Sequence, residues 1–336
     1  MTGSGEPAQA AAGEPLLRVE DLQVRFRTAA GILPAVDGVG FELRSGETLG
    51  LVGESGSGKT VTSLALLRLL ESPPAEIRAG RVLLEGRDLF TLGEREMADV
   101  RGRDASMIFQ EPMTSLNPVL SVGYQIAEPL VRHLGMSQAA ARARTVELLE
   151  QVGIPNPARA AADYPHRLSG GMRQRVMIAL AIACKPKVLV ADEPTTALDV
   201  TIQAQILALL VDLQQALGMS MLLITHDLAV IAETAHRVAV MYAGRIVEIA
   251  PVEAIFGAPR HPYTKGLLRS IPRIERTRES MLPEIPGTVP SLAALPPGCA
   301  FVDRCPRALE RCRTDRPELA AMGHGHRASC WNPADA

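Results

Sequence analysis

One eight-residue segment limits the possible folds more than any other part of this 336-residue sequence: Gly53-Glu54-Ser55-Gly56-Ser57-Gly58-Lys59-Thr60. It fits the pattern G-x-x-x-x-G-K-[ST] and lies between an apolar strand, LGLV, and a segment with helical spacing of apolar residues. In this setting the backbone N–H groups of the loop face phosphate oxygens, and the helix directs its N-terminus at the same point. We expect every residue of the segment except Glu54 to bind nucleotide, with Lys59 on the β- and γ-phosphates and Thr60 on Mg²⁺.

The order of the apolar segments predicts an α/β fold. Short strands with near-alternating apolar residues over 16–51 favour an antiparallel sheet, and several helical stretches over 111–168 favour a small helical insertion. Strands predicted at 188–192 and 221–225 alternate with helices at 172–184 and 201–218, which favours a parallel sheet covered on both faces. We expect a flexible tail over 1–15, a nucleotide-binding domain over 16–259 that ends with a hairpin at 238–250, and a Pro-, Arg- and Cys-rich appendage over 260–336.

Composition excludes two classes of function. The chain has 35 Lys and Arg against 37 Asp and Glu, and only six Phe, four Tyr and one Trp, so neither a cationic surface nor a base-stacking platform for nucleic acid is expected. The longest apolar run, Val176 to Cys184, is much shorter than a membrane span, and residues 1–15 do not resemble a secretory signal. A cytoplasmic protein is the expectation.

A pair of carboxylates follows the buried strand predicted at 188–192. Asp192 at the end of this strand can complete the Mg²⁺ shell, and Glu193 is then placed to polarise an attacking water. Taken alone, an apolar run that ends in Asp-Glu also describes a strand that meets a polar loop. Together with the phosphate loop, it favours ATP hydrolysis.

The segment Leu168-Ser169-Gly170-Gly171-Met172-Arg173-Gln174 opens a predicted helix. Ser169 is a candidate N-cap, and the exposed N–H groups of the two glycines could bind an anion, although a capped helix explains the pattern equally well. With GESGSGKT and VLVADEP in the same order, LSGGMRQR resembles the signature of the ATP-binding cassette family, LSGGQ, with Met172 in place of Gln. This resemblance implies a P-loop cassette with an antiparallel subdomain, a parallel core and a helical subdomain.

The resemblance also assigns roles to four further residues. It implies that Gln110 touches Mg²⁺ or the attacking water, that Asp199 crosses a dimer interface, that His226 contacts the γ-phosphate and that Phe26 stacks on adenine. Judged without the resemblance, they are explained as a surface amide, a helix cap, a loop histidine and a core aromatic. The family sandwiches two nucleotides between two subunits, so Ser169, Gly170 and Gly171 are expected to serve the ATP of the partner.

The C-terminal region indicates which branch of the family the chain resembles. HPYTKGLL at 261–268 and the later Cys-Pro pattern are similar to ATP-binding subunits of oligopeptide, dipeptide and nickel importers. This implies a peripheral subunit on the cytoplasmic face of the inner membrane, with two permease subunits, a second homologous ATPase and, indirectly, a solute-binding protein. A nickel importer ATPase and a soluble cassette protein are the alternatives; the second lacks its usual coiled coils or fused cassettes here.

Four of the five cysteines lie close together in the sequence. Cys299, Cys305, Cys312 and Cys330 fall within 32 residues, and in a reducing compartment such a group favours metal over disulfides. No short C-x₂₋₄-C knuckle occurs, although a zinc site that includes His324 or His326, or free thiols, stays open. The resemblance to peptide importers implies a [4Fe–4S] cluster. Cys184 lies on an apolar helical run and is interpreted as core.

Overall fold

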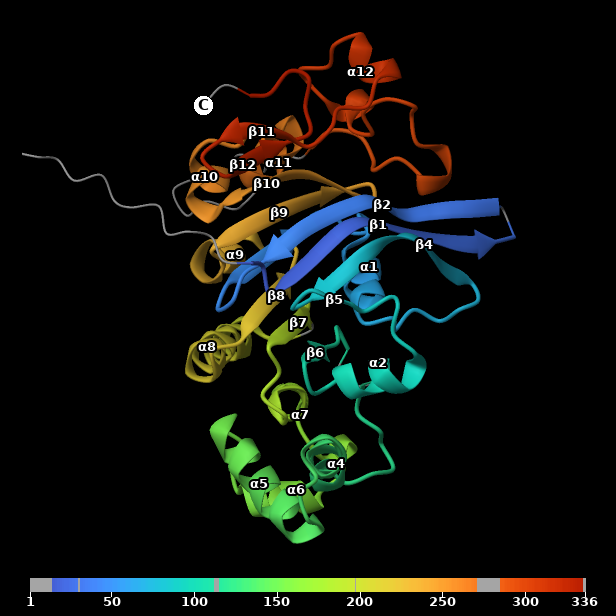
Figure 1. Cartoon of the computed structure of the whole chain (residues 1–336). Helices are drawn as coiled ribbons and strands as arrows, with labels where there is room; N and C mark the ends of the chain where they lie inside the picture. The colour runs from blue at the N-terminus through green and yellow to red at the C-terminus, as the bar shows by residue number, and fades with distance from the viewer. Residues whose placement is uncertain (1–13, 30, 112–114, 197, 271–284, 335–336) are drawn as a thin grey trace, which may run out of the picture.

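The computed structural model describes residues 14–29, 31–111, 115–196, 198–270 and 285–334. The tail predicted over 1–15 therefore lies almost wholly outside the described residues. Two sheets organise the molecule, as Figure 1 shows. The main sheet has eight strands in the order β11-β12-β10-β9-β3-β8-β7-β6. These strands are, in chain order, β3 (Thr48–Val52), β6 (Ala105–Ile108), β7 (Val188–Asp192), β8 (Ser220–Ile224), β9 (Arg237–Tyr242), β10 (Arg245–Pro251), β11 (Ala320–Gly323) and β12 (His326–Ala328).

The second sheet is antiparallel, in the order β2-β1-β4-β5. Its strands are β1 (Leu17–Thr28), β2 (Gly31–Leu43), β4 (Ala75–Leu84) and β5 (Arg87–Asp88). Helix α1 (Lys59–Leu66) lies between the two sheets, and one buried apolar cluster joins all three layers through residues such as Val24, Leu66 and Leu222. The antiparallel subdomain and the parallel core that the sequence predicts are therefore confirmed.

Of the remaining helices, α2 (Glu94–Val100) packs into the same buried cluster as α1, and the others lie on the other face and at the ends of the main sheet (Figure 1). The other α-helices are α4 (Val122–Leu134), α5 (Gln138–Gln151), α6 (Pro157–Ala162), α7 (Gly170–Ile182), α8 (Val200–Leu217), α9 (Leu228–Thr234), α10 (Val252–Gly257), α11 (Pro262–Arg269) and α12 (Arg311–Thr314). Short 3₁₀ turns lie at Pro165–Arg167, Leu292–Ala294 and Val302–Arg304.

Helix α8 joins the neighbouring parallel strands β7 and β8. By length and composition it is apolar enough to cross a bilayer, a test that core helices of soluble proteins also pass. Because a connection between adjacent parallel strands must pack back onto their sheet, α8 serves here as the crossover of the nucleotide-binding core.

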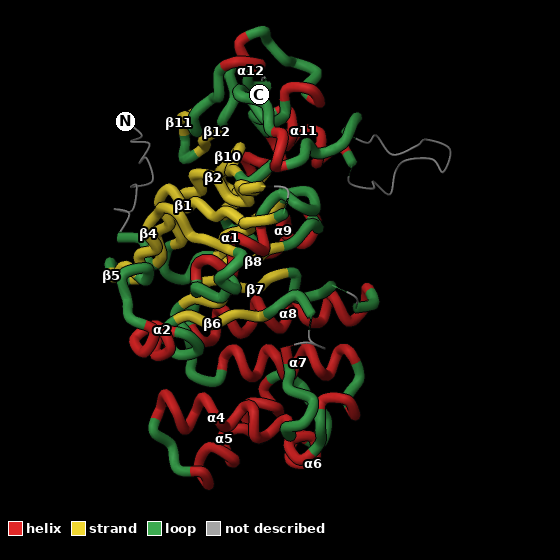
Figure 2. The backbone as a smooth tube through the Cα atoms, turned by 90° about the vertical axis from the view of Figure 1, so that its right-hand side faces the viewer, coloured by secondary structure: helices red, strands yellow, loops and turns green. Residues whose placement is uncertain are grey.

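Helices α4, α5 and α6 form the end of the molecule opposite to the appendage (Figure 2). Ser121 and Ser137 cap α4 and α5 by accepting hydrogen bonds from Tyr124 N and Ala140 N. Ile126 and Leu148 pack in the apolar cluster that also contains Val176 of α7 and Ile206 of α8. The helical subdomain is thereby attached to the same core that holds the parallel strands.

The appendage continues the main sheet. Strand β12 pairs with β10, with Ala328 opposite Glu248. Residues near the C-terminus thus extend the sheet in which β3 is a central strand. Glu248 is fully buried and accepts hydrogen bonds from Arg260 N at 2.6 Å and His261 N at 2.9 Å. The His326 ring lies 2.6 Å from the same carboxylate. These hydrogen bonds to the buried Glu248 carboxylate connect the appendage to the core.

Candidate functional site

The predicted phosphate loop connects the end of β3 to the start of α1. Lys59 is 6% exposed, and its Nζ donates to the carbonyl oxygens of Gly53 at 2.8 Å and Glu54 at 3.1 Å. Burial lowers the Lys59 pKa, against the opposing effect of Glu193, Asp192 and Glu54. The loop is thus closed around its lysine by main-chain carbonyls that a phosphate could replace.

Two features of the loop, one in its backbone and one in a side chain, fit a site for an anion. Gly58 has a φ of +102°, and a Cβ there would lie 2.7 Å from the Ala35 carbonyl oxygen, so only glycine is accommodated. Ser57 is buried, and its Oγ has no hydrogen-bond partner among the described residues. Ser55 and Gly56 are exposed at the tip of the loop. An unpaired buried hydroxyl in a cradle of this kind is accounted for by a bound phosphate oxygen.

Asp192 lies beside Thr60, as the paired motifs predict. It is 1% exposed at the carboxyl end of β7, 3.4 Å from Thr60 Oγ1 and 3.0 Å from Ser63 Oγ. Burial raises the Asp192 pKa, and the hydrogen bonds from Ser63 and Thr60 partly offset this effect. A carboxylate and a hydroxyl in contact at this edge are the donors that Mg²⁺ takes in phosphate sites, so these residues fit the ion.

The Glu193 carboxylate contacts three side chains that lie in different parts of the sequence or close after it: Gln110, His226 and Thr196. Its Oε2 accepts from Gln110 Nε2 at 3.1 Å and from Thr196 Oγ1 at 2.8 Å, and its Oε1 lies 3.4 Å from His226 Nδ1. Burial acts to raise the Glu193 pKa, but the bonds from Thr196 and His226 outweigh it and lower the pKa overall. Its φ of +45° is a left-handed conformation that a glutamate rarely adopts. The carboxylate is therefore ionised and held in place.

The predicted signature residues lie away from this site. Ser169 caps α7, where its Oγ accepts from Met172 N at 3.3 Å, and the first turn begins with the exposed Gly170 and the half-buried Gly171. Asp199 likewise caps α8, with its Oδ1 3.0 Å from Ile202 N. Within the described part of the chain, none of these four residues makes a hydrogen bond or ion pair to the phosphate loop of its own subunit.

Phe26 lies on β1, where it is partly buried against the cluster between the two sheets. This position is compatible with both readings of its role, adenine stacking and core packing. Sequence reasoning missed Thr196, which follows Glu193 by three residues and orients its carboxylate. It also missed Tyr263 and Arg304, which contact the phosphate loop from the appendage.

The four C-terminal cysteines lie in one subdomain but are not gathered as a metal site. Among the described residues, no group of three or more His, Cys, Asp or Glu side chains is placed to hold a metal ion. Burial raises the pKa of Cys299, Cys305 and Cys330, the last to about 11. In the described part of the appendage, the four thiols interact electrostatically with one another but are not arranged to hold the expected [4Fe–4S] cluster or the zinc alternative. Cys184 is buried, and burial raises its pKa to about 11, as a core thiol requires.

Two family models match the sequence. The model for "ABC transporter" matches residues 36–196, and the model for "Oligopeptide/dipeptide transporter, C-terminal region" matches residues 247–312. The chain is similar to a probable peptide ABC transporter ATP-binding protein, y4tR, of Sinorhizobium fredii, with 54% identity over 94% of both chains. It is also similar to the oligopeptide transport ATP-binding protein OppD of Bacillus subtilis, with 53% identity over 94% of this chain and 88% of OppD.

A third relative is the dipeptide transport ATP-binding protein DppD of Escherichia coli, with 50% identity over 95% of this chain and 97% of DppD. Among solved structures, the fold is similar to one described as "Dimeric Structure of MJ0796, a Bacterial ABC Transporter Cassette", with a TM-score of 0.63 and 27% identity. That match covers 70% of this chain and 98% of the other.

Proposed function

Because the chain belongs to the ABC transporter family, as an ATP-binding subunit, we propose that it hydrolyses ATP to power the import of dipeptides or oligopeptides. The relatives that match over nearly the whole chain are described as ATP-binding proteins of peptide, oligopeptide and dipeptide transport. This supports peptides over nickel as the imported solute. The observation that carries the ATPase function is the Glu193 carboxylate, which Gln110, Thr196 and His226 contact beside Asp192.

Each residue of the site then has a defined part in hydrolysis. Lys59 and the loop N–H groups bind the β- and γ-phosphates, while Glu193 accepts a proton from the attacking water. His226 and Gln110 hold Glu193 and face the γ-phosphate and the water. Thr60 and Asp192, with Gln110, would hold Mg²⁺, which neutralises charge on the phosphates when bound.

We also propose that Ser169, Gly170, Gly171 and Asp199 act on a second ATPase subunit. The support is that these residues lie at two helix starts, where all but the half-buried Gly171 are exposed, and make no described bond to their own phosphate loop. A similar cassette has been solved as a dimer. A helix N-terminus offered to the partner's γ-phosphate makes the nucleotide part of the interface, so ATP closes the pair. The partner is a second copy or a homologous subunit.

An apolar groove is suited to receive a membrane permease. It has a volume of about 390 Å³ and is lined by residues that include Leu69, Arg101, Phe109, Pro129 and Met177. Leu69 and Phe109 are large apolar side chains that are more than a third exposed, at 36% and 37%. Exposed apolar side chains that line a groove are typical of a protein interface. Because Phe109 directly precedes Gln110, a partner seated here touches the loop that contacts Glu193.

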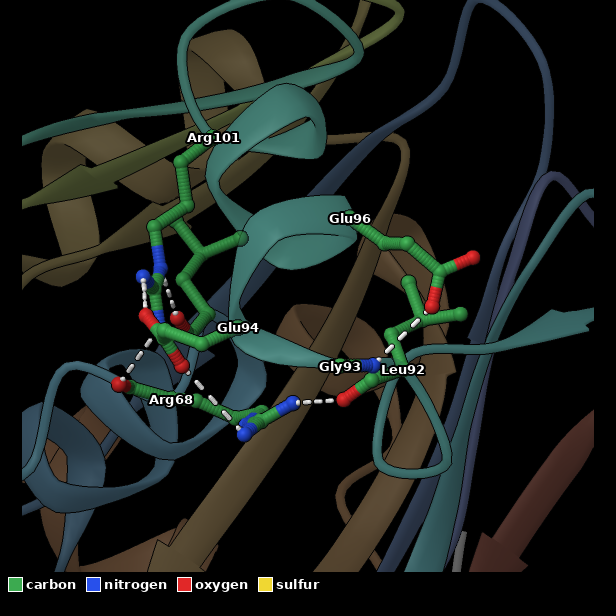
Figure 3. Close-up of polar contacts among 7 residues, drawn as sticks. Arg68, Leu92, Gly93, Glu94, Glu96 and Arg101 are labelled. Carbon is green, nitrogen blue, oxygen red and sulfur yellow. Dashed lines mark hydrogen bonds and ion pairs between the residues drawn. The ribbon is translucent and has the colours of Figure 1, made fainter.

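A network of ion pairs and hydrogen bonds involves Arg101, which lines this groove (Figure 3). Glu94 of α2 lies between Arg68 and Arg101, and both arginines form ion pairs with it. Arg101 also donates to the Arg68 carbonyl oxygen at 3.0 Å, and Arg68 donates to the Leu92 carbonyl oxygen at 2.6 Å. These contacts orient the Arg101 side chain at the edge of the groove.

Assembly with permeases is tested by co-purification. We expect the chain, expressed with its two permease subunits, to be recovered with them in detergent, and Phe109→Asp to reduce recovery at least about tenfold because a charge would enter the apolar groove. Val119→Asp is the control, since Val119 is 75% exposed and does not line the groove. Normal recovery with Phe109→Asp would contradict docking at this groove. Recovery of the chain only as a soluble protein, with no permease, would favour the soluble-cassette alternative.

The location that this function requires is the cytoplasmic face of the inner membrane, where ATP is available and the permeases are accessible. An importer of this kind receives its solute from a solute-binding protein, which the ATPase does not touch. The resemblance to peptide importers and the proposed direction of transport imply both this location and this partner.

The metal content of the appendage stays a prediction from resemblance, since the described side chains do not gather as a metal site. The thiols that would hold the metal lie in one subdomain, where the Leu309 N–H donates to Cys312 Sγ at 3.4 Å. The cluster that the resemblance implies predicts that anaerobic purification gives a brown protein with about one [4Fe–4S] cluster per chain. A colourless protein without iron ends the cluster prediction, and stoichiometric zinc replaces it.

A further inference from the structure

The appendage reaches the phosphate loop at Glu54. The Glu54 N–H donates to Tyr263 Oη at 2.9 Å, and its carboxylate accepts two hydrogen bonds from Arg304, at 2.7 and 3.0 Å. The Glu54 carbonyl oxygen accepts from Lys59 Nζ at 3.1 Å. The appendage therefore contacts Glu54, one of the two residues whose carbonyl oxygens accept hydrogen bonds from the phosphate-binding Lys59.

Arg304 is itself firmly placed. Its side chain is 6% exposed, and it also donates to the carbonyl oxygens of Pro286 at 3.0 Å and Ile285 at 3.3 Å. The hydrogen bonds to Glu54, which outweigh burial, raise the Arg304 pKa, so the guanidinium stays charged. A buried, bidentate arginine is a geometrically specific contact, unlike a surface ion pair.

We propose that Arg304 is a positioning residue for ATP binding, which acts through Glu54 to hold the phosphate loop and to neutralise the carboxylate that the loop carries. This inference rests on the proposed ATPase function. It assigns to the C-terminal appendage a direct effect on nucleotide affinity.

The Glu54 carboxylate also brings a negative charge into the phosphate loop. A carboxylate within a phosphate loop repels the polyphosphate that the loop has to bind, and the repulsion is strong where water is partly excluded. Arg304 supplies the compensating charge with both of its terminal nitrogens. If Arg304 is removed, Glu54 keeps its main-chain contact with Tyr263 but carries an uncompensated negative charge.

The test compares ATP dissociation constants by calorimetry. We expect Arg304→Met to raise the constant by about 10- to 100-fold, while the turnover rate at saturating ATP changes little. Arg304→Lys retains the charge without the bidentate fork and should raise it by roughly three- to tenfold. Adding Glu54→Gln to Arg304→Met should restore most of the affinity, because it removes the unpaired carboxylate.

The matched control is Arg316→Met. Arg316 also joins the appendage to the core, through an ion pair with Asp37 at 3.1 Å, but Arg245 pairs with the same carboxylate and the phosphate loop is not involved. ATP affinity within twofold of the unsubstituted protein is expected for this variant.

Three outcomes would overturn the proposal: unchanged affinity in Arg304→Met, an equal loss in Arg316→Met, or no rescue by Glu54→Gln. A purely structural anchor lowers the melting temperature but is not rescued by a change of charge in the loop. If Arg304→Met fails to fold, Arg304→Lys, alone and with Glu54→Gln, decides the question. Lys59→Ala is included because normal ATP binding by that variant would overturn the proposed function itself, whereas loss only in Lys59→Ala would overturn this inference alone.

Discussion

Replacing Glu193 with Gln is expected to slow ATP hydrolysis by ~10²–10⁴-fold, or roughly 3–5 kcal/mol in the activation barrier, while ATP binding is retained. The amide has nearly the shape of the carboxylate, so the contact with Thr196 can persist. It cannot accept a proton from water. The lowered pKa of Glu193 means that the native side chain is ionised at neutral pH and available as a base.

The measurement is a single-turnover rate with ATP and Mg²⁺, alongside a dissociation constant for ATP. Glu233→Gln serves as the control, since Glu233 is exposed on α9. Because hydrolysis releases the closed pair, Glu193→Gln should also accumulate an ATP-bound dimer on gel filtration. Turnover equal to that of the unsubstituted protein would remove Glu193 from the role of general base.

Lys59→Ala is expected to weaken ATP binding by about 100-fold or more. The lysine is almost fully buried in the loop, and its ammonium group is the charge that the phosphates meet there. Each charge-assisted hydrogen bond contributes about 1.5–3 kcal/mol, and the loss of two such bonds accounts for this change.

Calorimetric titration with ATP measures the effect, and Lys187→Ala is the matched control. Lys187 forms an exposed ion pair with Glu85, and such pairs contribute little to stability. A normal dissociation constant for Lys59→Ala would exclude the loop as the phosphate site. Equal losses in both lysine variants would point to general destabilisation instead.

The residues that short motifs carry could be predicted from the sequence, because each motif fixes its own local geometry. The resemblance singled out Gln110 and His226 for contacts with Mg²⁺, water and the γ-phosphate, but it did not predict that both side chains contact Glu193. Thr196 was missed because nothing in the tripeptide after Glu193 distinguishes an orienting hydroxyl from a loop threonine. The four-cysteine expectation relied on the grouping of the cysteines in the sequence and on the resemblance to peptide importers, and neither determines how the thiols are arranged in space.

Contacts between distant segments explain most of what the sequence could not show. Arg304 and Glu54 are 250 residues apart, and no local pattern marks either as a partner of the other. The sequence predicts an appendage outside the nucleotide-binding domain, yet β12 joins the main sheet. This strand has only three residues, which is too few to produce a strand pattern in the sequence. Helix α1 ends at Leu66, although its apolar periodicity continues to Leu70, because Arg68 adopts a left-handed conformation with a φ of +51°.

The extension of the main sheet by β12 also sets an order of events during synthesis. Strand β3 and the phosphate loop leave the ribosome long before residues 304–328, which supply the partner of Glu54 and the outer neighbour of β10. Since domains fold as their segments emerge, the nascent chain passes through a stage in which the loop exists without its arginine and β10 has an unpaired edge. Nucleotide added to stalled nascent chains would therefore bind weakly until the appendage has emerged.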